Sequence, residues 1–431
     1  MIIRGRHAQR DTEYTLSLKP DSLSVAVNFN TVLVYDRAGR FYSLYKDSHH
    51  YRRSLSGQVL QKWQDADSQH RPSRQRQWLE HNAVEGLIDF AAGQVQQLRA
   101  ALFAPDWHWL TPPDHSQQLD DIVSVIERAA QFTATAARAD AVRFAQVYSP
   151  IGMLPPDQYL ALVLQATEGC SFNTCTFCDL YHQAFRVKTL DEFRQHIRQV
   201  RDYLGESILL RQHAIFLGAA NALAIPMARL VPMLEIIQQA CHSEEPQRGD
   251  EESPASESET PRQAKNDSRG IYAFLDAFTG TRKSVEDYGQ LAELGLKRVY
   301  IGLESGHDPL LQFVKKPGQA VDAIETVQAI KAAGINVGVI VMIGLGGDRF
   351  AEGHTRDTVA VLNQMQLGAG DLIYFSDLVE EPDTPYPLLA AQQDIYALSA
   401  DERAAQRAAL RADLKLNGAK ISNYDVREFV Y

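Results

Sequence analysis

The chain has 431 residues, of which 45% are hydrophobic and 23% are charged. This length and balance predict one large domain together with a smaller one. The formal net charge of −11 at pH 7 argues against a protein that binds nucleic acid by bulk electrostatic attraction. The first residues lack the apolar core of a signal peptide, and no stretch reaches the roughly 20 apolar residues that span a bilayer. We therefore expect a cytoplasmic protein without a membrane partner.

Cysteine is scarce and unevenly placed. The chain has four cysteines; Cys170, Cys175 and Cys178 lie within nine positions, whereas Cys241 stands apart. Small secreted domains show the reverse pattern, with many cysteines spread along the chain to form disulfides. Clustered thiols in a reducing compartment instead predict metal binding.

Residues 1–150 show a mixed pattern that predicts an N-terminal α+β accessory domain. Apolar runs at 31–35 and 41–45 flank the turn sequence DRAG, which indicates a β-hairpin. Apolar residues at helical spacing predict helical stretches near 78–102 and 119–147, with a proline-rich break between them.

A basic and aromatic stretch runs from residue 37 to residue 53. Its cations are Arg37, Arg40, Lys46, Arg52 and Arg53, interleaved with four aromatic residues. One interpretation is an RNA-contacting surface, because aromatic rings stack on bases while cations meet phosphates. The other is a hairpin with one exposed basic face, which we favour because the chain as a whole is acidic. We therefore expect no nucleic-acid partner.

Residues 151–385 alternate between strand and helix patterns and predict the core domain. The first strand is expected at 161–166, directly before the cysteines, and the helix after them begins with a capping box formed by Thr189 and Glu192. Further strands are expected at 213–217, 271–276, 298–303, 337–343 and 372–376, and further helices near 224–241, 284–294, 319–333 and 352–366. Six successive units predict an α/β fold, a partial (β/α)6 TIM-like barrel with its functional residues at the carboxyl ends of the strands.

Two segments depart from this alternation. Residues 242–270 are rich in Glu, Ser and Pro and almost free of apolar residues, which predicts a disordered acidic insertion. The alternative for this insertion is an acidic docking segment for a partner. Residues 386–431 are expected to form a C-terminal helical extension.

The cysteines form a C-x4-C-x2-C pattern on the loop that follows the first strand of the core. Three thiolates suit an iron–sulfur cluster that keeps one iron open, whereas a closed tetrahedral zinc site takes four ligands. No His-x3–5-His pair accompanies the cysteines. Structural zinc remains the alternative to the cluster.

This loop resembles that of the radical S-adenosylmethionine superfamily, whose commonest spacing, C-x3-C-x2-C, has one residue fewer. The resemblance implies that Cys170, Cys175 and Cys178 hold a 4Fe-4S cluster. It further implies that the open iron is chelated by the amino and carboxylate groups of the cofactor's methionine part. Phe177, directly before the last cysteine, occupies the position of an aromatic near the adenine. Without the cysteines, we would interpret Phe177 as an ordinary core aromatic.

The resemblance continues after the second predicted strand. There the family carries a motif of glycines and an acid that holds the methionine amino group, and this chain has the sequence GAAN, which starts at Gly218 and ends at Asn221. Backbone carbonyls can accept from an ammonium group, and the Asn221 side-chain oxygen can add a further acceptor. Gly218 and Asn221 are therefore implied cofactor contacts.

Two later strands complete the implied cofactor site. The fourth ends in Gly302, Glu304 and Ser305, similar to the element that places polar groups near the ribose and methionine of the cofactor. For Glu304 the alternative is a capping carboxylate for the next helix. Gly344 opens a glycine-rich stretch after the fifth strand that is similar to the support of the adenine; the order of a phosphate-binding P-loop is missing there.

Two related cofactor arrangements are excluded by the residues present. His108 lies in a sequence similar to the cobalamin signature Asp-x-His-x-x-Gly, but Thr111 stands where the glycine belongs, so we expect no cobalamin. No cysteine follows Cys241, so we expect no second cluster.

The resemblance thus implies an oxygen-sensitive enzyme that receives an electron from a reductant such as flavodoxin or ferredoxin. It would cleave S-adenosylmethionine reductively to a 5′-deoxyadenosyl radical, which abstracts hydrogen from an unidentified substrate. One alternative is a non-catalytic scaffold or regulatory protein that binds the cluster and S-adenosylmethionine. The other is a structural metal protein with an RNA-binding N-terminal domain.

Overall fold

A computed structural model describes residues 2–64, 74–180, 183–211, 213–242, 270–280 and 282–431. Its contacts divide the chain into two compact units. The first unit comprises Met1–Leu162, His196–Gln212 and Arg427–Tyr431, and the second comprises Val163–Gln195 and His213–Val426. The predicted acidic insertion lies almost entirely at 243–269, outside the described residues.

The first unit is built on an antiparallel sheet of nine strands within the described residues, in the order β8-β7-β6-β5-β4-β3-β2-β1-β9. The strands are β1 (Ile2–His7), β2 (Thr12–Leu18), β3 (Ser22–Val27), β4 (Thr31–Asp36), β5 (Phe41–Lys46), β6 (His49–Arg53), β7 (Val59–Gln64), β8 (Arg74–Trp78) and β9 (Trp107–Thr111). The predicted hairpin is confirmed, since β4 and β5 pair antiparallel with Leu33 opposite Leu44. Alternate side chains on these strands are buried, as expected for a sheet with one covered face.

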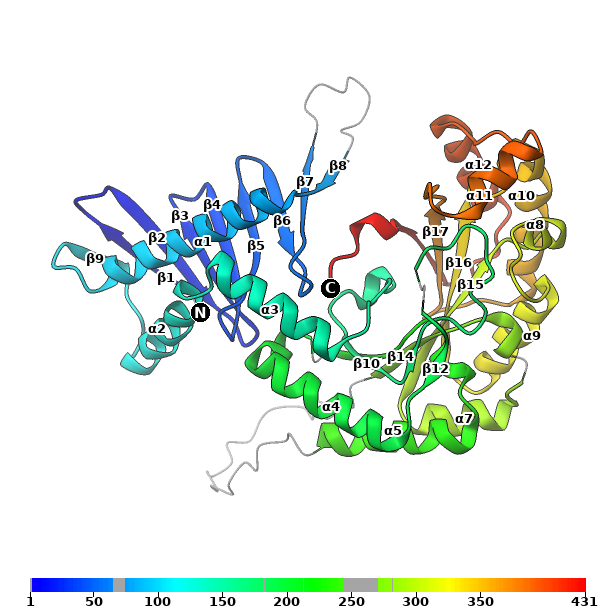
Figure 1. The fold of residues 1–431 in the computed structure, drawn as a ribbon, viewed down its shortest axis with the longest axis horizontal. Helices are drawn as coiled ribbons and strands as arrows, with labels where there is room; N and C mark the ends of the chain where they lie inside the picture. The colour runs from blue at the N-terminus through cyan, green and yellow to red at the C-terminus, as the bar shows by residue number, and fades with distance from the viewer. Residues whose placement is uncertain (1, 65–73, 181–182, 212, 243–269, 281) are drawn as a thin grey trace, which may run out of the picture. The chain divides into compact units, whose positions relative to one another are not determined.

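Three helices pack against that face (Figure 1). They are α1 (His81–Leu102), α2 (Ser116–Ala130) and α3 (Ala134–Val147). The stretch predicted as one helix near 119–147 is therefore two. The chain breaks before Thr133, whose side chain accepts a hydrogen bond from the Ala136 backbone N–H at 3.4 Å and caps α3.

The basic stretch does not form a single exposed basic face. Arg40 and Arg53 are buried in the first unit, and both pair with the carboxylate of Asp140 on α3. Arg52 precedes Arg53 on β6, and its side chain points to the opposite face of the sheet because strand side chains alternate. The hairpin prediction is confirmed, but the predicted exposed basic face was wrong for Arg40 and Arg53, which are buried.

The second unit is built on a seven-stranded sheet in the order β10-β13-β14-β15-β16-β17-β18. The strands are β10 (Leu162–Gln165), β13 (Ala214–Gly218), β14 (Gly270–Leu275), β15 (Leu296–Glu304), β16 (Asn336–Ile343), β17 (Leu372–Asp377) and β18 (Lys420–Tyr424). Neighbours from β13 to β18 pair in parallel. In the described residues the two edge strands do not pair with each other. The α/β fold with an open, partial barrel is confirmed.

Helices connect these strands and lie outside them (Figure 1). The longer ones are α4 (Leu190–Leu204), α5 (Met227–His242), α7 (Val285–Glu293), α9 (Ala320–Ala332), α10 (Gly347–Gln364) and α12 (Ala400–Ala412), and the shorter ones are α6 (Ala277–Gly280), α8 (Asp308–Phe313) and α11 (Pro385–Gln392). Of these, α4 begins in the second unit and belongs to the first unit from His196 onward. The predicted capping box of α4 is present. The Thr189 N–H donates to Glu192 Oε2 at 2.6 Å, and the Glu192 N–H donates to Thr189 Oγ1 at 3.2 Å.

The segment expected to be a helical extension, 386–431, contains α12 but also supplies strand β18. Its sequence, KISNY, is short and mostly polar, and only its last residue is buried. Such an edge strand carries almost no hydrophobic pattern.

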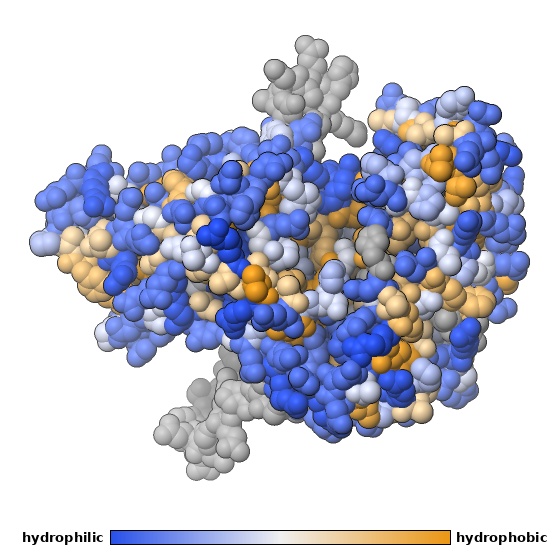
Figure 2. Space-filling view, in the orientation of Figure 1, coloured by the Kyte–Doolittle hydropathy of each residue, from blue (hydrophilic) through white to orange (hydrophobic). Residues whose placement is uncertain are grey.

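Hydrophilic residues dominate the face seen in Figure 2, with apolar residues in small groups. Across the described chain no helix combines the length and apolar character that a membrane crossing requires.

Candidate functional site

The predicted site residues gather at one edge of the parallel sheet. The carboxyl ends of parallel strands meet at the same edge, and the cysteine loop follows β10, Gly218 ends β13, Glu304 ends β15 and Gly344 follows β16. The sheet therefore brings together motifs that lie up to 174 residues apart in the sequence, from Cys170 to Gly344.

A small antiparallel ladder closes the base of the cysteine loop. Its strands are β11 (Thr167–Glu168) and β12 (Arg186–Val187), with Glu168 opposite Arg186. The Arg186 guanidinium donates to both Glu168 oxygens at 2.9 and 3.0 Å, and Lys188 Nζ donates to the same carboxylate at 2.7 Å. These hydrogen bonds, of which those from Arg186 have the largest effect, lower the pKa of Glu168 to about 2. The two strands at the base of the loop are therefore joined by charge-assisted hydrogen bonds.

Thr176 anchors the middle of the loop from two sides. Its N–H and its hydroxyl both donate to the Val314 carbonyl, at 3.0 and 3.3 Å, and its own carbonyl accepts from the Tyr386 N–H at 3.0 Å. The Thr174 hydroxyl donates to the Lys315 carbonyl at 3.1 Å. The segment between two of the cysteines is thereby fixed to the chain that follows α8 and to the start of α11.

The three thiols of the loop are free and half-buried. Burial raises the pKa of Cys175 to about 11 and raises the pKa of Cys178 as well, and the neighbouring thiols contribute to both shifts. Thiols must lose their protons when they bind a metal, so metal binding would release the protons of Cys175 and Cys178. Among the described residues, no three His, Cys, Asp or Glu side chains are grouped as ligands of a single metal ion.

Glu304 and Lys316 form a buried ion pair beside the cysteines. Lys316 Nζ lies 3.5 Å from Glu304 Oε1, and the Lys316 charge also acts on Cys175. Burial raises the pKa of Glu304. Burial alone would lower the pKa of Lys316, but the electrostatic interactions with Glu304 and Cys175 outweigh it, so the pKa of Lys316 is also raised. Glu304 Oε2 is buried and has no hydrogen-bond partner in the described part of the chain. An orphaned carboxylate oxygen of this kind is costly unless a ligand pairs with it.

The backbone at the end of β15 is shaped for this carboxylate. Glu304 has a φ of 60°, which lies in the left-handed region that non-glycine residues rarely adopt. A Cβ atom on Gly302 would lie 2.5 Å from Glu304 Oε1, so a larger residue there would displace the carboxylate from this position. Such strain is typically retained at functional sites.

Ser305 is placed differently from its neighbour. It is fully buried, and its oxygen lies 2.7 Å from His354 Nδ1 and accepts from the His307 N–H at 3.0 Å. His354, on α10, also places Nε2 3.0 Å from the Met342 carbonyl. Ser305 therefore connects the end of β15 to α10, which the sequence alone did not indicate.

Asn221 contacts an acid that the sequence analysis missed. The Asn221 side chain donates to the carboxylate of Asp276 and, at 2.8 Å, to Ser171 Oγ, while its oxygen accepts from the Asp276 N–H at 3.1 Å. Asp276 directly follows β14, the strand next to β13. An acid at the end of the predicted strand 271–276 was the available signal, but its closeness to Asn221 depends on the strand order.

The remaining predicted residues lie on the same edge in supporting positions. Phe177 is half-buried and packs against an apolar cluster that includes Leu310, Val314 and Tyr386. The carbonyl of Gly218 accepts from the Ala166 N–H at 2.8 Å, which joins β13 to the start of the cysteine loop. Gly344 adopts a φ of 84°, and its N–H donates to Gln406 Oε1 at 2.8 Å.

Comparison with protein families identifies this part of the chain. Residues 164–358 match the model of the radical SAM superfamily. The matched range begins in β10 and ends in α10, so it contains the cysteine loop and the ends of strands β13 to β16. No curated protein matches the chain in sequence.

Solved structures give weaker similarities. The radical S-adenosylmethionine methyltransferase TsrM from Kitasatospora setae is 18% identical, with a TM-score of 0.38 over 54% of this chain and 37% of that chain. Coproporphyrinogen III oxidase (HemN) from Escherichia coli is 13% identical, with a TM-score of 0.39 over 62% of this chain and 53% of that one. The chain thus spans less than two thirds of the length of either protein.

Proposed function

We propose that the chain cleaves S-adenosylmethionine reductively at a 4Fe-4S cluster bound by Cys170, Cys175 and Cys178. The proposal is supported by the match of residues 164–358 to the radical SAM superfamily, a family of enzymes. The observation that carries the proposal is the anchored loop with three free, half-buried thiols at the functional edge of the sheet. When bound, the cluster and S-adenosylmethionine supply a 5′-deoxyadenosyl radical for hydrogen abstraction.

The residues present fit a cluster by their donor chemistry. A cluster takes each thiolate on a different iron, so its ligands do not need to converge on one ion. This agrees with thiols that influence one another but are not grouped around a single-ion position. Lys316, close to Cys175, places a positive charge where thiolates would add negative charge.

The polar residues around the loop supply contacts for S-adenosylmethionine. Glu304 offers a buried carboxylate oxygen without a protein partner, which suits hydroxyl or ammonium donors of the cofactor. Asn221 already uses its amide for Asp276 and Ser171. We therefore assign the ammonium-binding role to the Asp276 carboxylate, with Asn221 as the residue that positions it. Gly218, Gly302, Gly344 and Phe177 would line the same edge.

The wider biochemical context follows from this chemistry. The cluster needs an electron, so a flavodoxin or ferredoxin is the proposed reductant, and the cytoplasm is the proposed location because it protects an oxygen-sensitive cluster.

Anaerobic reconstitution with iron and sulfide tests the proposal. We expect about four irons per chain and formation of 5′-deoxyadenosine after addition of dithionite and S-adenosylmethionine. Cys175→Ala should lose the iron, whereas Cys241→Ala should retain it as the matched cysteine control. A bound cluster without 5′-deoxyadenosine would favour the non-catalytic scaffold, and absence of both would refute the proposal.

A further inference from the structure

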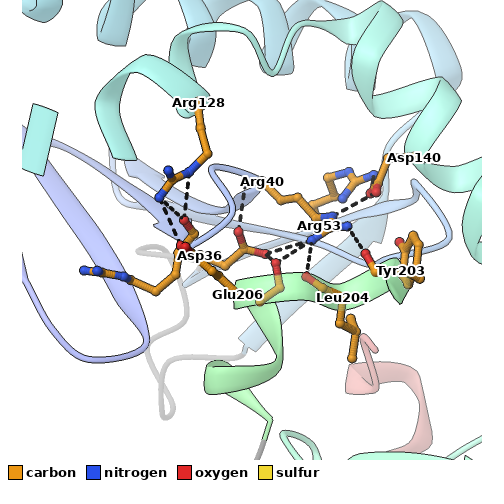
Figure 3. A network of polar contacts seen from close by, with 10 residues as sticks. Asp36, Arg40, Arg53, Arg128, Asp140, Tyr203, Leu204 and Glu206 are labelled. Atoms are coloured by element: carbon orange, nitrogen blue, oxygen red, sulfur yellow. Dashed lines mark hydrogen bonds and ion pairs between the residues drawn. The ribbon is translucent and has the colours of Figure 1, made fainter. Parts of the chain in front are cut away.

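Four buried charged residues of the first unit are neutralised by one another (Figure 3). Arg40 Nε and Arg53 Nη2 each lie 2.9 Å from an oxygen of Asp140. Arg40 also donates to the Leu204 carbonyl at 3.0 Å, and its backbone N–H donates to Asp36 at 2.9 Å. This is the expected pattern, because a buried charge is costly unless it is paired.

Two arginines of the same unit break this pattern. Arg211 is only 4% exposed, and its Nη1 is buried without a hydrogen-bond partner. Arg52 is half-buried on β6, and its Nε and Nη2 are likewise buried and unpaired. Within the described residues, neither guanidinium has an acidic partner. Three donor atoms on two cations are thus left without acceptors.

Aromatic rings cover the flat faces of both guanidinium groups. The Arg211 guanidinium lies 4.1 Å from the centre of the Tyr431 ring, and that of Arg52 lies 5.2 Å from the centre of the Tyr42 ring. Phe429 lies between Tyr159 and Tyr431, with ring centres 5.4 and 6.5 Å away. Stacking of this kind satisfies the faces of a guanidinium but leaves its N–H edge available to an acceptor.

The two arginines also act on each other. Burial lowers the pKa of Arg52, and although Tyr42 opposes this, the positive charge of Arg211 lowers it further. Like charges brought together in a buried place repel, and the unfolded chain would separate them. An anion between the groups would remove both the repulsion and the unpaired donors.

We propose that Arg52 and Arg211 form an oxyanion-binding site in the first unit, which takes the phosphate or carboxylate group of a ligand. Guanidinium groups present parallel N–H donors that match two oxygens of such a group. Half-buried Arg52 supplies one contact to the ligand, and buried Arg211 supplies the second, desolvated contact. The tyrosine rings hold both side chains in place for binding. The site is independent of the proposed radical chemistry.

Calorimetric titration of the full chain with inorganic phosphate tests this site. We expect saturable binding of one phosphate to the wild-type chain, and a loss of affinity of about tenfold or more in Arg52→Gln and Arg211→Gln. Arg128→Gln is the matched control. Arg128 is a part-buried arginine of the same unit that pairs with Glu206 at 3.0 Å, so its replacement should leave phosphate binding unchanged. If Arg211→Gln does not fold, Arg52→Gln still tests the site.

Titrations with acetate and citrate separate the two ligand sources. Tighter binding of phosphate than of the carboxylates would assign a phosphate-bearing ligand, and the reverse order would assign a carboxylate. A thermal scan adds an independent measure, because a ligand that binds the folded state raises the unfolding midpoint in a saturable way. The proposal fails if no anion binds saturably, or if all three variants bind phosphate as the wild type does.

Discussion

The Ser305 hydroxyl lies 2.7 Å from Nδ1 of His354 in the interior of the second unit. Because His354 Nε2 faces the Met342 carbonyl at 3.0 Å, the ring proton resides on Nε2 and Nδ1 accepts from the Ser305 hydroxyl. The Ser305 oxygen in turn accepts from the His307 N–H at 3.0 Å. One serine thus links β15, the loop after it and α10.

Replacement of Ser305 by alanine separates a structural role from direct cofactor binding. The change leaves the His307 N–H without its acceptor and removes a donor from His354, so we expect a loss of about 1–2 kcal/mol in the free energy of unfolding. Affinity for S-adenosylmethionine should change little. Urea unfolding and equilibrium dialysis measure the two quantities. A large loss of cofactor affinity with unchanged stability would instead make Ser305 a direct contact.

The buried His354 makes stability sensitive to acid. Burial lowers the pKa of its imidazole to about 4, below the ordinary value of about 6.5. Between these values the unfolded chain binds the proton and the folded chain does not, so stability rises with pH in this window and is lost as the pH falls through it. The loss should reach the order of 3 kcal/mol by about pH 4. Urea unfolding at pH 7, pH 5 and pH 4 measures this loss.

His354→Gln provides the control for this assignment. Glutamine keeps a hydrogen-bonding side chain but does not titrate. The variant should therefore be less stable at pH 7 and show a smaller decrease between pH 7 and pH 5 than the wild type. An unchanged decrease would assign the acid sensitivity to other groups.

Glu304 is expected to bind the cofactor through its unpaired oxygen. Glu304→Gln keeps the size and one carbonyl oxygen but removes the negative charge, so the affinity for S-adenosylmethionine should fall by about tenfold, the effect of one charge-assisted hydrogen bond. Iron content should be retained. Equilibrium dialysis and iron analysis measure the two effects. Glu286→Gln, an exposed glutamate in the first turn of α7, is the matched control, and equal affinities in the two variants would contradict the assignment.

The sequence predicted the parallel sheet because its central strands are continuous apolar runs bounded by glycines and polar turns. Strands such as β16, with nearly every residue buried, carry this signal in full. The edge strand β18 escaped prediction since its side chains are largely exposed. Local patterns thus predict strands whose side chains are buried, including the edge strand β10, but not the exposed edge strand β18.

The site was predictable only where a residue could be assigned from its place at the end of a strand and from a recognisable local motif. The three cysteines and Glu304 follow strands that the pattern reveals. The role of Asp276 depends on its hydrogen bond with Asn221, 55 residues earlier. The role of Ser305 depends on its hydrogen bond with His354, 49 residues later. Contacts at such separations depend on strand order and helix packing, which no local motif encodes.

Asp276 is expected to recognise the amino group of the cofactor's methionine part. Asp276→Asn removes the charge that pairs with an ammonium and should weaken S-adenosylmethionine binding by about tenfold. An analogue that lacks the amino group should bind the variant and the wild type equally, which makes the analogue an internal control. Equilibrium dialysis with both compounds measures the difference. If the variant weakens both compounds alike, Asp276 supports the fold of the site and does not contact the amino group.

Arg186 is expected to keep the cluster in place from a distance. It ties the base of the cysteine loop through two hydrogen bonds to Glu168, so Arg186→Ala should let the loop open and release iron to a chelator several times faster than the wild type. The rate is followed by the visible absorbance of the cluster after addition of chelator under anaerobic conditions. Arg194→Ala is the matched control, since Arg194 also pairs with a carboxylate, Asp191 at 2.9 Å, but does so on the surface of α4. The Arg186 and Arg194 side chains are equally exposed, at 48% each, so equal rates for the two variants would show that the ladder does not control cluster retention.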